Sequence, residues 1–322
     1  MQPLVYLNEE DIQQIGINWS DIIDTIHSTC LAMGTTNYAQ PIKTYLRYGD
    51  QGNRIIAMPG FVGEDINLAG IKWIASFPGN LDQGKKRAHS ITILNDTNTG
   101  EPKAILNTAL ISGIRTAGVS AFITQYWDQR TDSRRLKVGM TGFGPVGKLH
   151  LQMLFYVLGD QLEKFVIYDL RGVSRDELPA AYADRIVLAS SWQEAFEEAD
   201  VFVTCTVAPR PYVDMAPKKG SLHLNVSLRD YQDAWVKYAD VIIVDSWEEV
   251  CREKTDIERM HLNYGLQKEH VYDILQVVKD ELPVRQTDTV MFNPMGMSVF
   301  DIAIGGYFVR KASEKNVGLL LS

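Results

Sequence analysis

A glycine-rich turn between a predicted strand and a predicted helix restricts the fold more than any other feature of the sequence. Residues 137–140 are largely apolar, and Gly142, Gly144 and Gly147 follow with the spacing G-x-G-x-x-G before a helical pattern begins. Such glycines permit a tight bend, a close approach of the backbone to a pyrophosphate, and close packing of helix on strand. The helix start offers free N–H groups to phosphates. This pattern predicts a dinucleotide-binding turn, with an ordinary glycine turn as the alternative.

Asp169 ends the next predicted strand, residues 164–168, at about the spacing of 20 residues typical of dinucleotide-binding domains. A carboxylate there accepts hydrogen bonds from ribose hydroxyls and repels a 2′-phosphate, which favours NAD over NADP. Two alternatives stay open. Arg171 is close enough in sequence to bind a phosphate, and Asp169 can equally cap a turn.

Composition excludes several classes of protein. The 322-residue chain is 45% hydrophobic and 22% charged, which is typical of globular proteins, and no apolar run reaches the ~20 residues of a membrane span. The formal net charge of −8 argues against a nucleic-acid partner. The N-terminus lacks the pattern of a secretory signal, so we expect a cytoplasmic protein. The three cysteines are far apart in the sequence and predict neither a disulfide nor a metal site.

The periodicity of apolar residues predicts an α/β protein with two domains. Short β-rich segments with Gly, Asp, Asn and Pro turns fill residues 44–95, which indicates a mostly antiparallel α+β domain. From residue 137 onward strands alternate with helices, as in a Rossmann-type doubly wound parallel sheet. We therefore predict a substrate-binding and dimerisation domain at 1–128, completed by a C-terminal helix within 295–322, and a Rossmann domain at 129–294.

Four charged residues lie in predicted strands, helices or loops where a charged side chain is a candidate for a functional role. Arg47, Lys72 and Arg115 lie in the first domain amid apolar neighbours, where a cation is costly without an anionic partner. Arginine suits a carboxylate, and a desolvated lysine can pass a proton. Asp230 follows a predicted strand of the Rossmann domain. The alternatives are an exposed strand arginine, a snorkelling lysine, an internal ion pair and a turn aspartate.

Several motifs occur together in one order along nearly the whole chain. They include Met58-Pro59, the run from Gly70 to Asn80, Ser112-Gly-Ile-Arg115-Thr-Ala-Gly, the glycine turn, and Asn225 followed by Asp230. This combination resembles the ornithine cyclodeaminase and mu-crystallin family. The resemblance implies two domains, a homodimer formed through the substrate domains, and a nicotinamide cofactor used at a C–N bond of a small amino-acid substrate.

The resemblance also implies roles for individual residues. Lys72 and Asp230 would be catalytic, while Arg47 and Arg115 would hold the substrate α-carboxylate beside Met58. The cofactor-binding residues would be Thr116, Gly142, Gly144, Pro145, Val146, Gly147, Asp169, Thr204, Cys205, Thr206, Ser227 and Asn293.

Departures from the family pattern narrow the predicted reaction. Ornithine cyclodeaminases carry a carboxylate two positions before Met-Pro, where this chain has Ile56. The Lys72–Asn80 run resembles the branch that oxidises N-(2-amino-2-carboxyethyl)-L-glutamate with NAD to give 2,3-diaminopropionate and 2-oxoglutarate. Asn293-Pro-Met-Gly-Met departs from that branch as well. A cyclodeaminase, a ketimine reductase and a non-catalytic NAD(P)-binding protein of mu-crystallin type therefore remain as alternatives.

Overall fold

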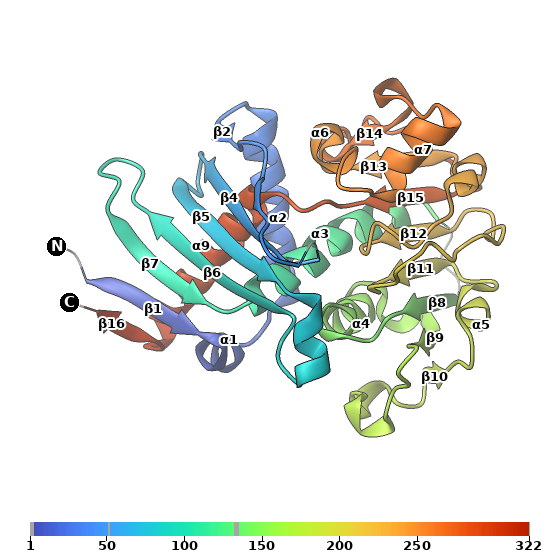
Figure 1. Cartoon of the computed structure of the whole chain (residues 1–322), viewed down its shortest axis with the longest axis horizontal. Coiled ribbons are helices and arrows are strands. Elements are labelled where there is room, and N and C mark those ends of the chain that lie inside the picture. The colour runs from blue at the N-terminus through green and yellow to red at the C-terminus, as the bar shows by residue number, and fades with distance from the viewer. Residues whose placement is uncertain (1–2, 51, 132–134, 322) are drawn as a thin grey trace. The chain divides into compact units, whose positions relative to one another are not determined.

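The computed structural model describes residues 3–50, 52–131 and 135–321 and divides into two compact units (Figure 1). Unit 1 comprises residues 1–118 and 296–322, and unit 2 comprises residues 119–295. The boundary thus falls at Gly118, within a helix, whereas the sequence suggested residue 128. The polar stretch of residues 127–135 also predicts a connector between the domains, of which residues 132–134 lie outside the described residues.

Unit 1 is built on one mixed sheet whose strands run in the order β16-β1-β7-β6-β5-β4-β2, with β3 also paired to β4. All of these pairs are antiparallel except β1 with β7. The strands are β1 Leu4–Asn8, β2 Tyr38–Ala39, β3 Thr44–Leu46, β4 Arg54–Val62, β5 Leu68–Ser76, β6 Ala88–Asn95, β7 Pro102–Asn107 and β16 Leu319–Leu321.

The helices of unit 1 are α1 Glu9–Ile15, α2 Trp19–Gly34, the 3-10 helix η1 Pro78–Gln83 and α9 Ser298–Lys315, with α3 Leu110–Asp128 shared between the units. Asn8 begins α1 through a capping box with Asp11, and the Asn18 side chain caps α2. Helix α9 packs on β4, β5 and β6 and against α2. The C-terminal segment therefore belongs to the first compact unit.

The register of the antiparallel strands separates the two faces of this sheet. Met58, Lys72 and Thr92 are cross-strand neighbours on β4, β5 and β6, and all three are buried. Because successive residues of a strand point to opposite faces, Trp73 and its neighbour Ile91 lie on the other face. Their side chains are 42% and 39% exposed. One face is thus core, and the other is an open apolar surface.

Unit 2 contains a second sheet, in the order β10-β9-β8-β11-β12-β15-β13-β14, and every one of these pairs is parallel. Its strands are β8 Leu136–Thr141, β9 Leu162–Tyr168, β10 Ile186–Leu188, β11 Val201–Thr204, β12 Leu222–Asn225, β13 Val241–Val244, β14 Tyr272–Asp273 and β15 Val290–Asn293. The central strands are buried along their length, which is consistent with their largely apolar sequences.

The helices of unit 2 are α4 Pro145–Leu158, α5 Trp192–Phe196, α6 Trp247–Val250, α7 Asp256–Tyr264 and α8 Ile274–Val278, with short 3-10 helices η2 Gly159–Gln161, η3 Arg175–Glu177, η4 Ala180–Tyr182, η5 Asp233–Tyr238 and η6 Lys268–His270. The predicted fold class, a doubly wound parallel sheet with a mostly antiparallel second part, is confirmed. None of the helices in the described ranges is long and apolar enough to cross a membrane.

Candidate functional site

The glycine turn lies in unit 2 between β8 and α4, and its geometry explains two of the three glycines. Gly142 has φ +87°, and a Cβ there would lie 2.5 Å from the carbonyl oxygen of Cys205. A Cβ on Gly147 would lie 2.3 Å from the carbonyl oxygen of Gly142. Any larger residue would push the turn away from the sheet. At Gly144, by contrast, a Cβ would meet nothing within 4 Å, so the space in front of this backbone is open.

The turn opens at the point where the strand order of the sheet reverses. Chain connections lead from β8 to β9 on one side, whereas β11 lies on the other side of β8. Ligands of doubly wound sheets bind at the carboxyl ends of the strands at such a switch point. The Cys205 N–H donates to the Thr141 carbonyl at 2.7 Å, which joins the ends of β8 and β11 there. Helix α4 begins with Pro145, and no side chain caps its first N–H groups.

Asp169 follows β9 at the same edge of the sheet. Its carboxylate accepts the Phe143 N–H at 2.7 Å and the Arg171 N–H at 2.9 Å. Arg171 also approaches it through Nε at 3.5 Å, with a side chain that is 69% exposed. The acid that the sequence assigned to the ribose is therefore tied to the glycine turn, and both alternatives named for it, a turn contact and a nearby arginine, are present as well.

The other predicted cofactor residues are divided between the strand ends of unit 2 and the unit 1 part of helix α3. Thr204 and Ser227 share a hydrogen bond of 2.9 Å between hydroxyls at the ends of β11 and β12. Asn293 is buried, and its amide bonds to Asn225 and to backbone carbonyls, so it braces the strand ends. Thr116 belongs to unit 1, where its hydroxyl donates to the Ser112 carbonyl. The assignment of these residues to cofactor binding stays a prediction.

Asp230 is the buried carboxylate of unit 2 that lies beyond the carboxyl end of β12. It has no exposed surface, and the Thr206 hydroxyl lies 2.7 and 2.8 Å from its two oxygens. The Tyr212 hydroxyl lies 3.2 Å from Oδ2. Burial raises the pKa of Asp230, against the lowering effect of hydrogen bonds from Thr206, Ser227 and Tyr212. A carboxylate with a raised pKa accepts a proton more readily than an ordinary carboxylate, as a general base must.

A second buried acid, Asp256, which sequence reasoning did not identify, holds the loop that carries Asp230. Asp256 Oδ2 accepts the backbone N–H of Asp230 at 3.2 Å and the side-chain amide of Asn225 at 2.8 Å. Arg259 pairs with the other oxygen of Asp256. Leu228, which lies between Asn225 and Asp230 in the sequence, adopts φ +61°, a strained conformation for a leucine. These contacts over-determine the loop, so the position of Asp230 is fixed.

Lys72 and Arg115 meet in unit 1 around one carboxylate. Lys72 Nζ lies 2.7 Å from Asp301 Oδ2 and 3.1 Å from the Ser112 hydroxyl. Arg115 donates through Nε to Asp301 Oδ1 at 3.0 Å. Strand β5 supplies Lys72, helix α3 supplies Ser112 and Arg115, and helix α9 supplies Asp301. Two of the cations predicted to be functional are thus brought together, and their counter-ion is a residue that sequence reasoning missed.

Burial controls the charge of Lys72, which is 2% exposed. Burial lowers its pKa to about 7, with Asp301 acting in the opposite direction and Arg115 and Lys43 adding to the lowering. Burial also acts on Asp301, but Arg115 and Lys72 outweigh it and hold the pKa of Asp301 below its ordinary value. At neutral pH Lys72 therefore exchanges between the ammonium and the neutral amine, as a lysine that transfers protons must.

Arg47, the third predicted cation, is placed differently. It is exposed and lies over the ring of Tyr45 at 5.2 Å. Lys43, four positions earlier, is buried at 6% exposure and acts electrostatically on Lys72. A lysine flanked by Ile and Thr in a segment rich in turn residues carries no sequence signal of burial. Met58 is the cross-strand neighbour of Lys72 and is buried beside it.

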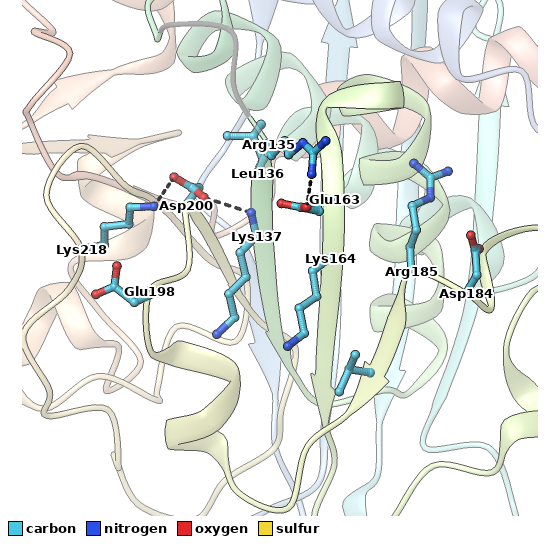
Figure 2. Close-up of a pocket in the computed structure, with 11 residues that line it drawn as sticks. Arg135, Leu136, Lys137, Glu163, Lys164, Asp184, Arg185, Glu198, Asp200 and Lys218 are labelled. Atoms are coloured by element: carbon cyan, nitrogen blue, oxygen red, sulfur yellow. Dashed lines mark hydrogen bonds and ion pairs between the residues drawn. The ribbon is translucent and has the colours of Figure 1, made fainter.

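One open cavity of about 520 Å³ lies elsewhere in unit 2, at the amino ends of the strands (Figure 2). Its wall alternates cations with acids. Asp200 accepts from Lys218 at 2.8 Å and from the Lys137 N–H at 3.0 Å, and Arg135 pairs with Glu163 at 2.9 Å. These charges neutralise one another, and the cavity lies at the edge of the sheet opposite the glycine turn.

Together, the switch point, the glycine turn and the acid after β9 define a dinucleotide-binding α/β protein with a separate, cation-bearing unit. The chain belongs to the ornithine cyclodeaminase/mu-crystallin family, whose model matches residues 9–316. The resemblance read from the sequence is thereby confirmed.

Three comparisons illustrate the relationship. The chain is 31% identical to the N-((2S)-2-amino-2-carboxyethyl)-L-glutamate dehydrogenase of Staphylococcus aureus, over 99% of this chain and 98% of that protein. Its fold matches a Thermococcus litoralis Delta(1)-pyrroline-2-carboxylate reductase in complex with NADH and L-proline, with a TM-score of 0.87, 21% identity and coverage of 99% and 100%. It also matches an archaeal alanine dehydrogenase dimer with bound NAD, with a TM-score of 0.84, 22% identity and 99% coverage of both chains.

Proposed function

We propose that the chain is an NAD-dependent oxidoreductase that acts on a C–N bond of an amino acid. Its proposed substrate is N-(2-amino-2-carboxyethyl)-L-glutamate, which is oxidised to an imine and hydrolysed to 2,3-diaminopropionate and 2-oxoglutarate. The observation that carries this proposal is the full-length similarity to the Staphylococcus aureus dehydrogenase. The buried cations of unit 1 support it, because a substrate with several carboxylates offers them partners.

The residues of unit 2 fit a bound NAD. The open space at Gly144 is where a pyrophosphate approaches the backbone, and the uncapped start of α4 offers N–H donors. Asp169, bonded to the glycine turn through the Phe143 N–H, would accept ribose hydroxyls and disfavour a 2′-phosphate. NAD, when bound, supplies the hydride acceptor for the oxidation.

The protein's own residues handle binding and protons. Arg115 holds the substrate α-carboxylate, and we retain Arg47 as a second carboxylate partner. Neutral Lys72 accepts the proton of the substrate amine, for which its lowered pKa suits it. Asp230 accepts a proton from the water that attacks the imine, and its raised pKa makes it a stronger base than an ordinary carboxylate.

A mixture of purified protein, NAD and N-(2-amino-2-carboxyethyl)-L-glutamate tests this function. We expect NADH absorbance and 2-oxoglutarate in equal amounts, with a higher kcat/KM for NAD than for NADP. If none of a panel of N-substituted amino acids produced NADH, the proposal would be refuted.

Imine reduction is the second candidate, because the Thermococcus litoralis structure shares the fold and is a pyrroline-2-carboxylate reductase. Under that alternative, NADH is consumed when a cyclic imine such as pyrroline-2-carboxylate is supplied. A cyclodeaminase acting on ornithine would release ammonia without net change in NADH. The three reactions are therefore separated by the sign of the absorbance change.

We further propose that the open face of the unit 1 sheet binds a second copy of the chain. This face carries Ile55, Ile71 and Ile93 beside the exposed Trp73 and Ile91. An apolar sheet face of this kind is normally covered in a stable protein. The archaeal alanine dehydrogenase of the same fold is a dimer, which favours a second copy as the partner.

A Trp73→Glu variant is expected to be monomeric, because a carboxylate would be buried without a partner in the middle of that face. We expect the dimer dissociation constant to rise by at least about 30-fold, as for a hot-spot residue worth ~2 kcal/mol. Light scattering across a dilution series measures it. Leu262→Glu is the matched control, since Leu262 is 70% exposed on α7 of unit 2. A Trp73→Glu protein as dimeric as the control would contradict the assignment.

A further inference from the structure

Asp301 forms hydrogen bonds with both Lys72 and Arg115 within unit 1. It is fully buried on α9, 186 positions from Arg115 and 229 from Lys72 in sequence. Each carboxylate oxygen serves a different cation, Oδ2 for Lys72 and Oδ1 for Arg115. A carboxylate shared in this way fixes the distance between the two cations as well as their orientations.

The segment that carries Asp301 makes a second contact with the same guanidinium. Gly296 has φ +86°, and a Cβ there would lie 2.5 Å from Nη1 and 2.6 Å from Nη2 of Arg115. The backbone before α9 therefore lies against the terminal nitrogens, while Asp301 engages Nε. Such a close approach is possible only at glycine. The C-terminal segment thus determines the position of Arg115 from two directions.

We propose that Asp301 is the positioning residue of the substrate site, holding Lys72 and Arg115 at a fixed separation so that one substrate meets both. This inference deepens the proposed function and rests on it for its kinetic readout. Asp301 itself need not touch the substrate, because both of its oxygens are occupied by the two cations. Ser112 supports the arrangement as a neutral partner of Lys72.

If Asp301 positions Lys72, its charge should also affect the pKa of Lys72. The negative charge of Asp301 opposes the lowering of the Lys72 pKa by burial, Arg115 and Lys43. Removal of that charge leaves the lowering effects unopposed, so the pKa of Lys72 falls below about 7. The rate, which depends on neutral Lys72, then keeps its plateau to lower pH. Loss of the fixed geometry acts separately and raises KM for a carboxylate-bearing substrate.

The test compares Asp301→Asn, which removes the charge, with Asp301→Glu, which keeps it on a longer side chain. NMR titration of lysine-labelled protein, with Lys72 assigned through Lys72→Met, measures the pKa of Lys72 without turnover. In Asp301→Asn we expect the Lys72 pKa to fall by at least about one unit, a tenfold change in the protonation equilibrium. In Asp301→Glu we expect titration near the wild-type value. KM should rise at least about tenfold in both variants, the loss expected for one charge-assisted contact.

Asp200→Asn is the matched control, because Asp200 is also buried and paired with a lysine. Its partner is Lys218, and the pair lies at the amino ends of the unit 2 strands. This variant should change stability without moving the Lys72 titration or KM. An unchanged Lys72 pKa in folded Asp301→Asn would overturn the proposal. If that variant does not fold, Asp301→Glu decides, and a wild-type KM in it would overturn the proposal. If the wild-type protein oxidises no amino acid, the proposed function is wrong. The pKa of Lys72 in the Asp301 variants still tests the role of Asp301, because its measurement needs no turnover.

Discussion

A Lys72→Met variant is expected to lose turnover by about 10²- to 10⁴-fold, the usual contribution of a positioned general acid or base. Methionine is close to lysine in shape but cannot accept a proton. Asp301 keeps Arg115 as its partner in the variant, so the buried carboxylate is not left without a counter-ion. We therefore expect a folded protein whose NAD affinity is unchanged, because the glycine turn and Asp169, which fit NAD, belong to unit 2.

The rate that depends on Lys72 should decrease at low pH. The pKa of Lys72 is lowered to about 7 by burial, so the neutral amine predominates above that pH and the ammonium below it. An amine acts as a base only when it is neutral, so the wild-type rate should fall as the pH drops through 7. The residual rate of Lys72→Met should lack that inflection.

Steady-state kinetics between pH 5 and 9, with NAD titrated by fluorescence, provide the measurement. Lys86→Met is the control, since Lys86 is an exposed lysine that pairs with Glu9 in the same unit. If Lys72→Met turned over at the wild-type rate, Lys72 would not be catalytic. If it lost NAD binding together with turnover, the separation of roles between the units would be wrong.

Local sequence rules were enough to predict the nucleotide-binding unit. The Gly142 turn, the apolar strands and Asp169 lie within one short stretch, and each has a requirement that sequence expresses directly, such as φ +87° at Gly142. Strands β1, β7 and β16 were not predicted. Strand β16, for example, consists of three leucines whose only strand partner, β1, lies at the other end of the chain.

The candidate site of unit 1 was predicted only in part, for a physical reason. Lys72 and Arg115 were singled out because a cation amid apolar residues needs an anion. That anion, Asp301, lies on α9, and no local pattern links it to β5 or α3. Lys43 was missed because its burial depends on the packing of a segment without regular structure. Pairing across long sequence separations is set by tertiary packing, which a single sequence does not display.

An Asp230→Asn variant should retain the oxidation step and lose the hydrolysis step. Asparagine keeps the shape of the carboxyl and its contacts with Thr206 and Tyr212, but it cannot take a proton from water. We expect a first turnover of NADH formation at nearly the wild-type rate, followed by a steady state slower by about 10²- to 10⁴-fold. Rapid-mixing absorbance, with 2-oxoglutarate assayed in parallel, distinguishes the two phases.

Two bases, each needed in one step, make the wild-type rate fall at acid pH. Burial raises the pKa of Asp230 above that of an ordinary carboxyl, and Lys72 titrates near 7. The slower of the two steps sets the steady-state rate, so below both values that rate should fall about tenfold per pH unit, because each step needs one deprotonated base. In Asp230→Asn the first turnover should keep this fall, since it depends on Lys72, whereas the slow steady phase should lack it.

Asp214→Asn controls for a change of charge in the same unit, because Asp214 is exposed and lies two positions from Tyr212. It should leave both phases and both slopes unaltered. If Asp230→Asn hydrolysed the imine as fast as the control, the water would be activated elsewhere or the imine would hydrolyse in solution. If the first turnover itself were slow, Asp230 would act on the substrate amine, and Lys72 would then be left with the role of a cation that holds the substrate.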